Sequence, residues 1–206
     1  MPQSRRYKKK KSAGKAILVW IIVLAILAAA VFVFVSVFYE DTKKKLDEMN
    51  YPRTYSTYVE KAAKDYDLDP ALIYAVIHTE SGFDPKAESG VGAKGVMQMM
   101  PSSFEWLQEQ RGCAGQYTED DLFDPEICID YGSYLLKYFY DYYGTERSAI
   151  AAYNAGFVVS DWLNDTKYSS DGKNLDSIPY PETENYVDKV EGAKEMYIKL
   201  YYSQSN

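Results

Sequence analysis

Residues 69–82 read DPALIYAVIHTESG and carry the signals of one complete helix. Asp69 can cap the free amide groups at a helix start, and proline is suited to the first helical position. Gly82 stands where a helix end commonly turns into the left-handed conformation. The sequence therefore predicts a helix from about Pro70 to Glu80.

Glu80 falls on the apolar side of this helix. At about 100° per residue, its direction lies between those of Leu72 and Ile77, inside the arc of aliphatic side chains. His78 and Tyr74 point to the opposite side. We therefore expect the only histidine of the chain at the surface and assign it no catalytic role.

A glutamate in this position should stay protonated at a higher pH than usual. Burial disfavours the charged carboxylate, and the negative end of the helix dipole acts in the same direction, so both raise the pKa of Glu80. A carboxylic acid that is protonated near neutral pH can donate a proton to a leaving oxygen, as in glycoside cleavage. Glu80 is thus a candidate general acid; the alternative is a glutamate that pairs with a lysine or caps a nearby loop.

The region around this helix is predicted to be all-α, because alternating strand patterns are missing apart from short glycine-rich pieces near 87–96. We expect one domain over residues 54–206. Many of the 21 tyrosines of the chain recur at helical spacing, and this spacing favours core packing over a saccharide-binding surface. Helical patterns cover residues 54–68, 71–80, 102–110, 127–144, 147–156 and 184–202.

The N-terminal part of the chain has the composition of a membrane anchor. Residues 16–38 form an uncharged apolar run long enough to cross a bilayer as a helix. Residues 1–15 hold basic side chains and no acidic ones, which predicts a cytoplasmic N-terminus and an outer domain beyond the membrane. Residues 39–53 are expected to form a stalk. A cleaved signal peptide is the alternative, but the apolar run is longer than a signal-peptide core.

Charge and cysteine content restrict the chemistry of the outer part. After residue 38 the chain has 16 Lys and Arg against 30 Asp and Glu, a net charge of −14, which argues against nucleic-acid binding. Cys113 and Cys128 fall in this part, where an oxidising compartment favours a disulfide over two unpaired thiols. With one histidine and no phosphate-binding glycine loop, the sequence implies no metal and no cofactor.

Four motifs in order resemble those of the soluble lytic transglycosylase catalytic domain, which has a goose-type lysozyme-like fold. They are ESGFDP (80–85), VGAKGVMQMMP (91–101), AAYNAG (151–156) and PETENYV (181–187). The resemblance covers about residues 54–200. It implies cleavage of the β-1,4 bond between N-acetylmuramic acid and N-acetylglucosamine in peptidoglycan, without water, leaving a 1,6-anhydro ring. Glu80 would then be the single catalytic acid and base.

The resemblance also implies roles for the other matched positions. Ser81 would bond to a substrate group or to the carboxyl of Glu80, and Tyr186 would lie close enough to orient that carboxyl. Gly92 and Gly95 would let loops line a groove closely. The residues expected to contact the sugars or form the groove wall are Met97, Gln98, Tyr153, Asn154 and Glu182.

Two other functions remain open from the sequence. A hydrolytic muramidase of the same fold would need a second acid to position water, with Asp84, Glu88 or Glu105 nearby in sequence. A catalytically idle peptidoglycan-binding scaffold of a wall-spanning machine would need no acid on an apolar helix face. The expected partners are peptidoglycan glycan strands, the membrane and cell-wall machinery proteins.

Overall fold

The computed structural model describes residues 13–203, with side chains from residue 17 onward, and the chain divides into two compact units. Most of the basic tail expected over residues 1–15 lies outside the described residues. In the first unit, helix α1 (Ala13–Asn50) contains the apolar run and continues through the first part of the expected stalk. Its stretch from Ile17 onward is long and apolar enough to span a membrane, and none of that stretch is buried.

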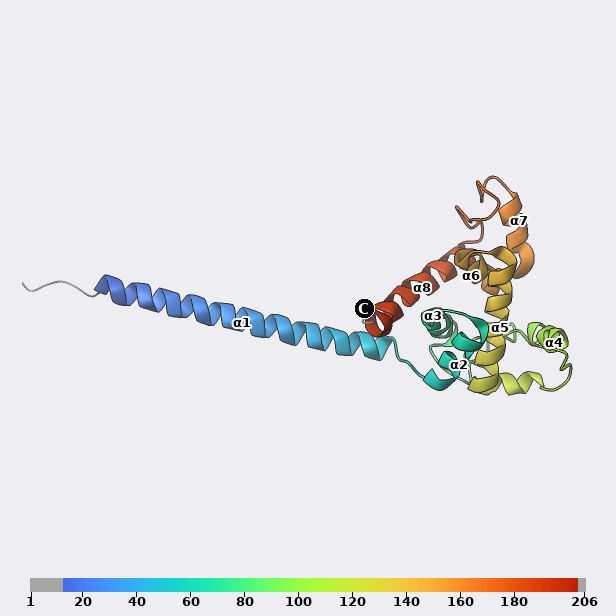
Figure 1. Ribbon diagram of the computed structural model, residues 1–206, viewed down its shortest axis with the longest axis horizontal. Helices are drawn as coiled ribbons and strands as arrows, with labels where there is room; N and C mark the ends of the chain where they lie inside the picture. Colours follow the sequence, from blue (N-terminus) through green and yellow to red (C-terminus); the bar gives the residue numbers. More distant parts are fainter. Residues whose placement is uncertain (1–12, 204–206) are drawn as a thin grey trace, which may run out of the picture. The chain divides into compact units, whose positions relative to one another are not determined.

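The second unit, from Tyr51 onward, is built from helices and connecting loops (Figure 1). Within the described residues there are isolated β-bridges but no strands, so the all-α prediction is confirmed. The α-helices are α2 (Ser56–Tyr66), α3 (Pro70–Ser81), α4 (Pro101–Gln110), α5 (Pro125–Tyr143), α6 (Glu146–Ala155), α7 (Val159–Asn164) and α8 (Pro181–Tyr197). Two short 3-10 helices, η1 (Glu119–Phe123) and η2 (Gly156–Val158), and the short π-helix η3 (Ile198–Tyr202) complete the unit.

Helix α3 begins and ends as its sequence predicts. The side chain of Asp69 accepts a hydrogen bond from the amide of Ala71, and Pro70 occupies the first turn. Gly82 ends the helix with a φ of 60°, in the left-handed region. The predicted helix over about 70–80 is therefore confirmed, with one further residue at its C-terminus.

The prediction that one side of α3, with Tyr74 and His78, faces solvent is wrong. All residues from Ala71 to Ile77 are buried, and Tyr74 is completely inaccessible. Its ring stacks on that of Tyr197, at 5.1 Å between centroids, and the ring of the partly buried His78 stacks on Tyr51 at 4.9 Å. Because α2 and α8 pack on α3 as well, this helix lies at the centre of the domain, and its last turn, from His78 to Ser81, is partly exposed.

The loop between α3 and α4 packs closely on η1. Gly95 has a φ of 76°, and a Cβ at this position would overlap the carbonyl oxygen of Leu122. Lys94 is buried and pairs with Glu119 at 3.1 Å and with Asp120 at 3.0 Å. A glycine is therefore required at position 95, where the two segments approach most closely.

The predicted disulfide is not formed, because both cysteines are free thiols. The Cys113 thiol lies 3.3 Å from the hydroxyl of Tyr131, and Cys128 is completely buried beneath the 94–97 loop. The segment after α4 is held in other ways. The Gln108 side chain exchanges two hydrogen bonds with the backbone of Tyr117, and Arg111 bonds to Asp130 at 2.6 Å. These contacts tie the segment to α5 without a covalent link.

Candidate active site

Glu80 lies in the last turn of α3, partly buried, with one specific partner. The Tyr186 hydroxyl, from α8, donates a hydrogen bond of 2.7 Å to Oε1 of Glu80. Burial raises the pKa of Glu80 to about 7, and the bond from Tyr186 acts in the opposite direction because it favours the charged form. The direction expected from the position of Glu80 is confirmed, with burial as the dominant cause.

Ser81, directly after Glu80, anchors the neighbouring loop. Its hydroxyl donates to the carbonyl of Val96 at 2.8 Å and accepts from the amide of Phe83 at 3.1 Å. Both contacts are internal to the protein. Ser81 therefore holds the 95–99 loop against the end of α3, whereas the expectation was a bond to substrate or to the carboxyl.

Met97 is completely buried, so the expected contact of its side chain with a sugar is wrong. The side chain packs on Gly132 of α5 so closely that a Cβ there would lie 2.5 Å from the methionine sulfur. What Met97 offers the site is its backbone, because its carbonyl accepts a hydrogen bond of 2.9 Å from the Tyr153 hydroxyl. Met97 thus orients Tyr153.

Gln98 is partly exposed and adopts a strained backbone conformation, with a φ of 46°. Its side-chain nitrogen donates to the carbonyls of Ala87 and Gly95, both at 3.0 Å. Its Oε1 accepts no hydrogen bond from the residues that the structure describes, so this atom is available to a ligand donor.

Asn154 is exposed at the end of α6 and is oriented by a residue that the sequence analysis missed. The hydroxyl of Thr183, buried in the first turn of α8, donates to Oδ1 of Asn154 at 2.8 Å. The amide nitrogen of Asn154 is thereby left to donate to a ligand. Thr183 could have been found from its spacing, because it precedes Tyr186 by three residues on one face of α8.

Two tyrosine hydroxyls border the carboxyl of Glu80. Tyr186 touches it directly, and burial is the main cause that raises the pKa of Tyr153 and Tyr186 well above the usual value, with the charge of Glu80 adding to it. Both phenols therefore remain neutral donors. Glu182 lies exposed in the first turn of α8, and its place at a groove wall stays a prediction.

Among the described residues, no second carboxylate perturbs Glu80, whose pKa is shifted by burial and Tyr186 alone. Asp84 is exposed, and its Oδ1 accepts the amide of Lys86 at 2.9 Å. Glu88 and Glu105 are also exposed. Within the part of the chain that the structure describes, Glu80 is thus the acid whose pKa the site raises, with the neutral hydroxyls of Tyr153 and Tyr186 beside it.

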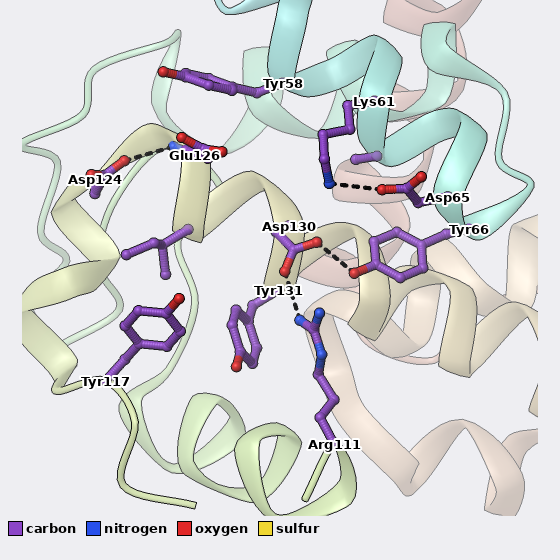
Figure 2. Close-up of a pocket in the computed structure, with 12 residues that line it drawn as sticks. Tyr58, Lys61, Asp65, Tyr66, Arg111, Tyr117, Asp124, Glu126, Asp130 and Tyr131 are labelled. Carbon is purple, nitrogen blue, oxygen red and sulfur yellow. Dashed lines mark hydrogen bonds and ion pairs between the residues drawn. The ribbon is translucent and has the colours of Figure 1, made fainter. Parts of the chain in front are cut away.

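A separate cavity of about 460 Å³ lies between α2, the end of α4 and α5, and shares no lining residue with the Glu80 site (Figure 2). Four of its charged side chains are engaged in ion pairs, and Asp124 accepts a hydrogen bond from the amide of Glu126 at the start of α5. Lys61 pairs with Asp65 at 2.7 Å, while Asp130 accepts both Arg111 and the hydroxyl of Tyr66. The bonds of Asp130 join α2, the end of α4 and α5, so these groups hold the fold together.

Comparison with known proteins gives the same family from sequence and from structure. The family model of the transglycosylase SLT domain matches residues 57–175. The soluble lytic murein transglycosylase of Escherichia coli K12 is 32% identical over 146 residues, covering 69% of this chain and 23% of that protein. The membrane-bound lytic murein transglycosylase C of Actinobacillus succinogenes is 30% identical over 170 residues, covering 72% and 48%.

The structural comparison agrees. The crystal structure of the 70 kDa soluble lytic transglycosylase of Escherichia coli superposes with a TM-score of 0.68 at 27% identity, covering 76% of this chain and 26% of that one. The chain spans about a quarter of the length of the soluble relatives it matches. The match of the family model covers more than half of the chain and includes Glu80, Ser81, Met97, Gln98, Tyr153 and Asn154. This chain belongs to the transglycosylase SLT domain family.

Proposed function

We propose that the chain is a membrane-anchored lytic transglycosylase that cuts the β-1,4 bond between N-acetylmuramic acid and N-acetylglucosamine, with Glu80 as its only acid and base. One observation carries this proposal: the carboxyl of Glu80 has a pKa of about 7 and accepts a hydrogen bond from Tyr186, and no second carboxylate among the described residues shifts that pKa. Its relatives are named lytic murein transglycosylases, which supports peptidoglycan as the substrate.

In the first step, protonated Glu80 donates its proton to the glycosidic oxygen as the bond from that oxygen to C1 of the muramic acid breaks. Positive charge develops at C1, and the carboxylate left on Glu80 is stabilised by the Tyr186 hydroxyl at 2.7 Å. In the second step, the C6 hydroxyl of the same sugar attacks C1 while Glu80 takes its proton. The 1,6-anhydro ring closes, the acid is regenerated, and no water is consumed.

The other groups of the site fit the binding of an acetylated sugar. The amide nitrogen of Asn154 can donate to a carbonyl or hydroxyl oxygen, and Oε1 of Gln98 can accept from an acetamido or hydroxyl group. Tyr153 is held by the Met97 carbonyl next to the carboxyl. These fixed groups would orient the reacting sugar before the proton moves.

Hydrolysis by the same fold is the second candidate. A hydrolytic glycosidase of the common two-carboxylate type keeps its acids about 5 to 9.5 Å apart. Asp84, the nearest alternative in sequence, is exposed and engaged with the backbone at Lys86. A substrate-supplied nucleophile explains the single acid with fewer assumptions.

We also propose that α1 anchors the enzyme with its N-terminus in the cytoplasm and the domain outside. The apolar side chains from Ile17 to Phe38 are almost all exposed in the protein, as lipid-facing residues would be. Residues 39–50 continue as helix, so this part of the stalk rises about 18 Å, well short of its extended length. Such an anchor would confine cutting to glycan near the membrane.

The test is product analysis of peptidoglycan incubated with the detergent-solubilised chain and with its Glu80→Gln variant. We expect muropeptides lighter by one water than hydrolytic products from the wild type, and none from the variant. Water-containing products that also require Glu80 would show a muramidase instead. If both proteins bind peptidoglycan and neither releases muropeptides, the catalytic function is rejected and the peptidoglycan-binding scaffold remains.

A further inference from the structure

An aromatic platform lies on the surface beside the Glu80 site. We define it as Trp106 of α4, Tyr138 and Tyr142 of α5, and Phe157 of η2. Phe157 is 50% exposed and Tyr142 is 59% exposed. Soluble proteins seldom present neighbouring large aromatic rings to water, and such patches mark binding surfaces.

The rings of the platform are ordered by one another. The ring of Phe157 stands nearly perpendicular to those of Trp106, Tyr138 and Tyr142, with centroid distances between 5.8 and 6.5 Å. Tyr138 and Tyr142 lie one helical turn apart with rings only 15° from parallel. The mutual packing keeps these side chains in place without a ligand, so little entropy would be lost on binding.

Two elements of the Glu80 site lead directly into this platform. Phe157 lies three positions after Asn154 in the chain, a span of at most about 10 Å. On the other side of the site, α4 begins at Pro101, soon after Gln98, and carries Trp106. The ring centroids of Trp106 and Phe157 are 6.5 Å apart. The two segments that follow Gln98 and Asn154 therefore come together at the platform.

The polar edges of the platform are free. Within the described residues, the hydroxyls of Tyr138 and Tyr142 and the indole N–H of Trp106 make no hydrogen bond. A hollow of about 330 Å³ beside the two tyrosines is also lined by the ion pair of Lys137 and Asp141, at 2.7 Å. Flat apolar faces edged by unused donors and acceptors suit a ligand that is itself apolar on its ring faces and polar at its periphery.

We propose that the aromatic platform is a sugar-binding surface that holds the glycan strand beyond the sugars bound at Glu80, so that the enzyme prefers long strands to short ones. This inference rests on the proposed function, because it takes the glycan as the ligand of the neighbouring site. A pyranose ring has the required chemistry, since its C–H faces stack on aromatic rings and its hydroxyl groups reach the tyrosine and indole edges. An apolar protein surface would leave those edges unpaired.

The test measures retention of peptide-free glycan strands, fractionated by length, on the detergent-solubilised chain carrying Glu80→Gln. In that background we compare Tyr142→Ala and Phe157→Ala with Tyr140→Ala. Tyr140 is the matched control, because it is 38% exposed on the same helix and makes no ring contact with the platform. All variants are checked for an unchanged circular dichroism spectrum and melting temperature.

We expect Tyr142→Ala and Phe157→Ala to weaken binding of long strands about tenfold, the scale of losing one good aromatic anchor. Binding of the shortest strands should be unchanged, as should all binding by Tyr140→Ala. Tyr142→Phe keeps the ring and should retain most of the affinity. Equal affinity of all variants for long strands would overturn the platform, and so would an equal loss for short and long strands.

Failure of the platform and failure of the proposed function are distinguishable. Glu80-dependent release of anhydro products with no effect of Tyr142→Ala on strand length preference would reject the platform alone. Absence of release by the wild type, together with platform-dependent binding of long strands, would reject the catalytic role of Glu80 and keep the sugar-binding surface.

Discussion

Removal of the Tyr186 hydroxyl should move the pH dependence of activity upward. This hydroxyl bonds to Oε1 of Glu80 at 2.7 Å and favours the charged carboxylate. A hydrogen bond to a charged group contributes about 1.5–3 kcal/mol, and one pKa unit corresponds to about 1.4 kcal/mol. Tyr186→Phe should therefore raise the pKa of Glu80 from about 7 by one to two units.

The assay is the pH dependence of kcat/KM for release of muropeptides, which reports ionisations of the free enzyme. Because the first step needs the protonated acid, the wild-type rate should fall on the alkaline side with a midpoint of about 7. In Tyr186→Phe this midpoint should move to about 8 to 9, whatever happens to the maximal rate.

The matched control is Tyr153→Phe, which removes a hydroxyl from the same site. That hydroxyl bonds to the Met97 carbonyl rather than to Glu80, so the midpoint should stay where it is in the wild type. A midpoint that stays at about 7 in Tyr186→Phe, or falls, would refute the assignment of the alkaline limb to the carboxyl of Glu80.

Three further outcomes are expected. Glu80→Gln should stabilise the fold at alkaline pH by up to about 3 kcal/mol and much less at acidic pH, as measured by urea unfolding at the two pH values. The reason is that the pKa of the Glu80 carboxyl rises from 4.5 to about 7 on folding, so the carboxyl favours the folded state fully below pH 4.5 and loses that contribution as the pH rises through 7. Gly95→Ala should lower the melting temperature severely, whereas Gly92→Ala, with a positive φ but open space around it, should cost about 1 kcal/mol, and equal losses would contradict the close packing at position 95. A reducing agent should leave the melting temperature unchanged, and a thiol reagent should label partly exposed Cys113 in the folded protein but Cys128 only after unfolding; a shift on reduction would reveal a disulfide.

The features that depend on neighbouring residues in the chain could be predicted from the sequence. Asp69 and Pro70 define the start of α3, Gly82 defines its end, and the helical repeat places Glu80 among apolar side chains. From these alone the direction of its pKa shift follows. The four short motifs, in their order along the chain, predict the family, and the family model matches residues 57–175, which contain the first three of them.

The errors concern contacts between residues far apart in the chain. A helical wheel shows which residues share a side of α3, but not that Tyr197, more than a hundred positions later, covers Tyr74. In the same way, the burial of Met97 depends on the absence of a side chain at Gly132. Such contacts depend on how the helices pack on one another, and the local patterns of a single sequence do not predict them.

The burial of residues 71–77 of α3 links catalysis to the thermal stability of the fold. Glu80 lies in the turn directly after this buried stretch and accepts a hydrogen bond from Tyr186 of α8, so a local opening that displaces the acid must also break its contact with α8. Thermal inactivation should therefore coincide with global melting, and no folded but inactive enzyme should accumulate at temperatures just below the melting temperature. In such a protein, residual activity after heating counts the surviving folded molecules.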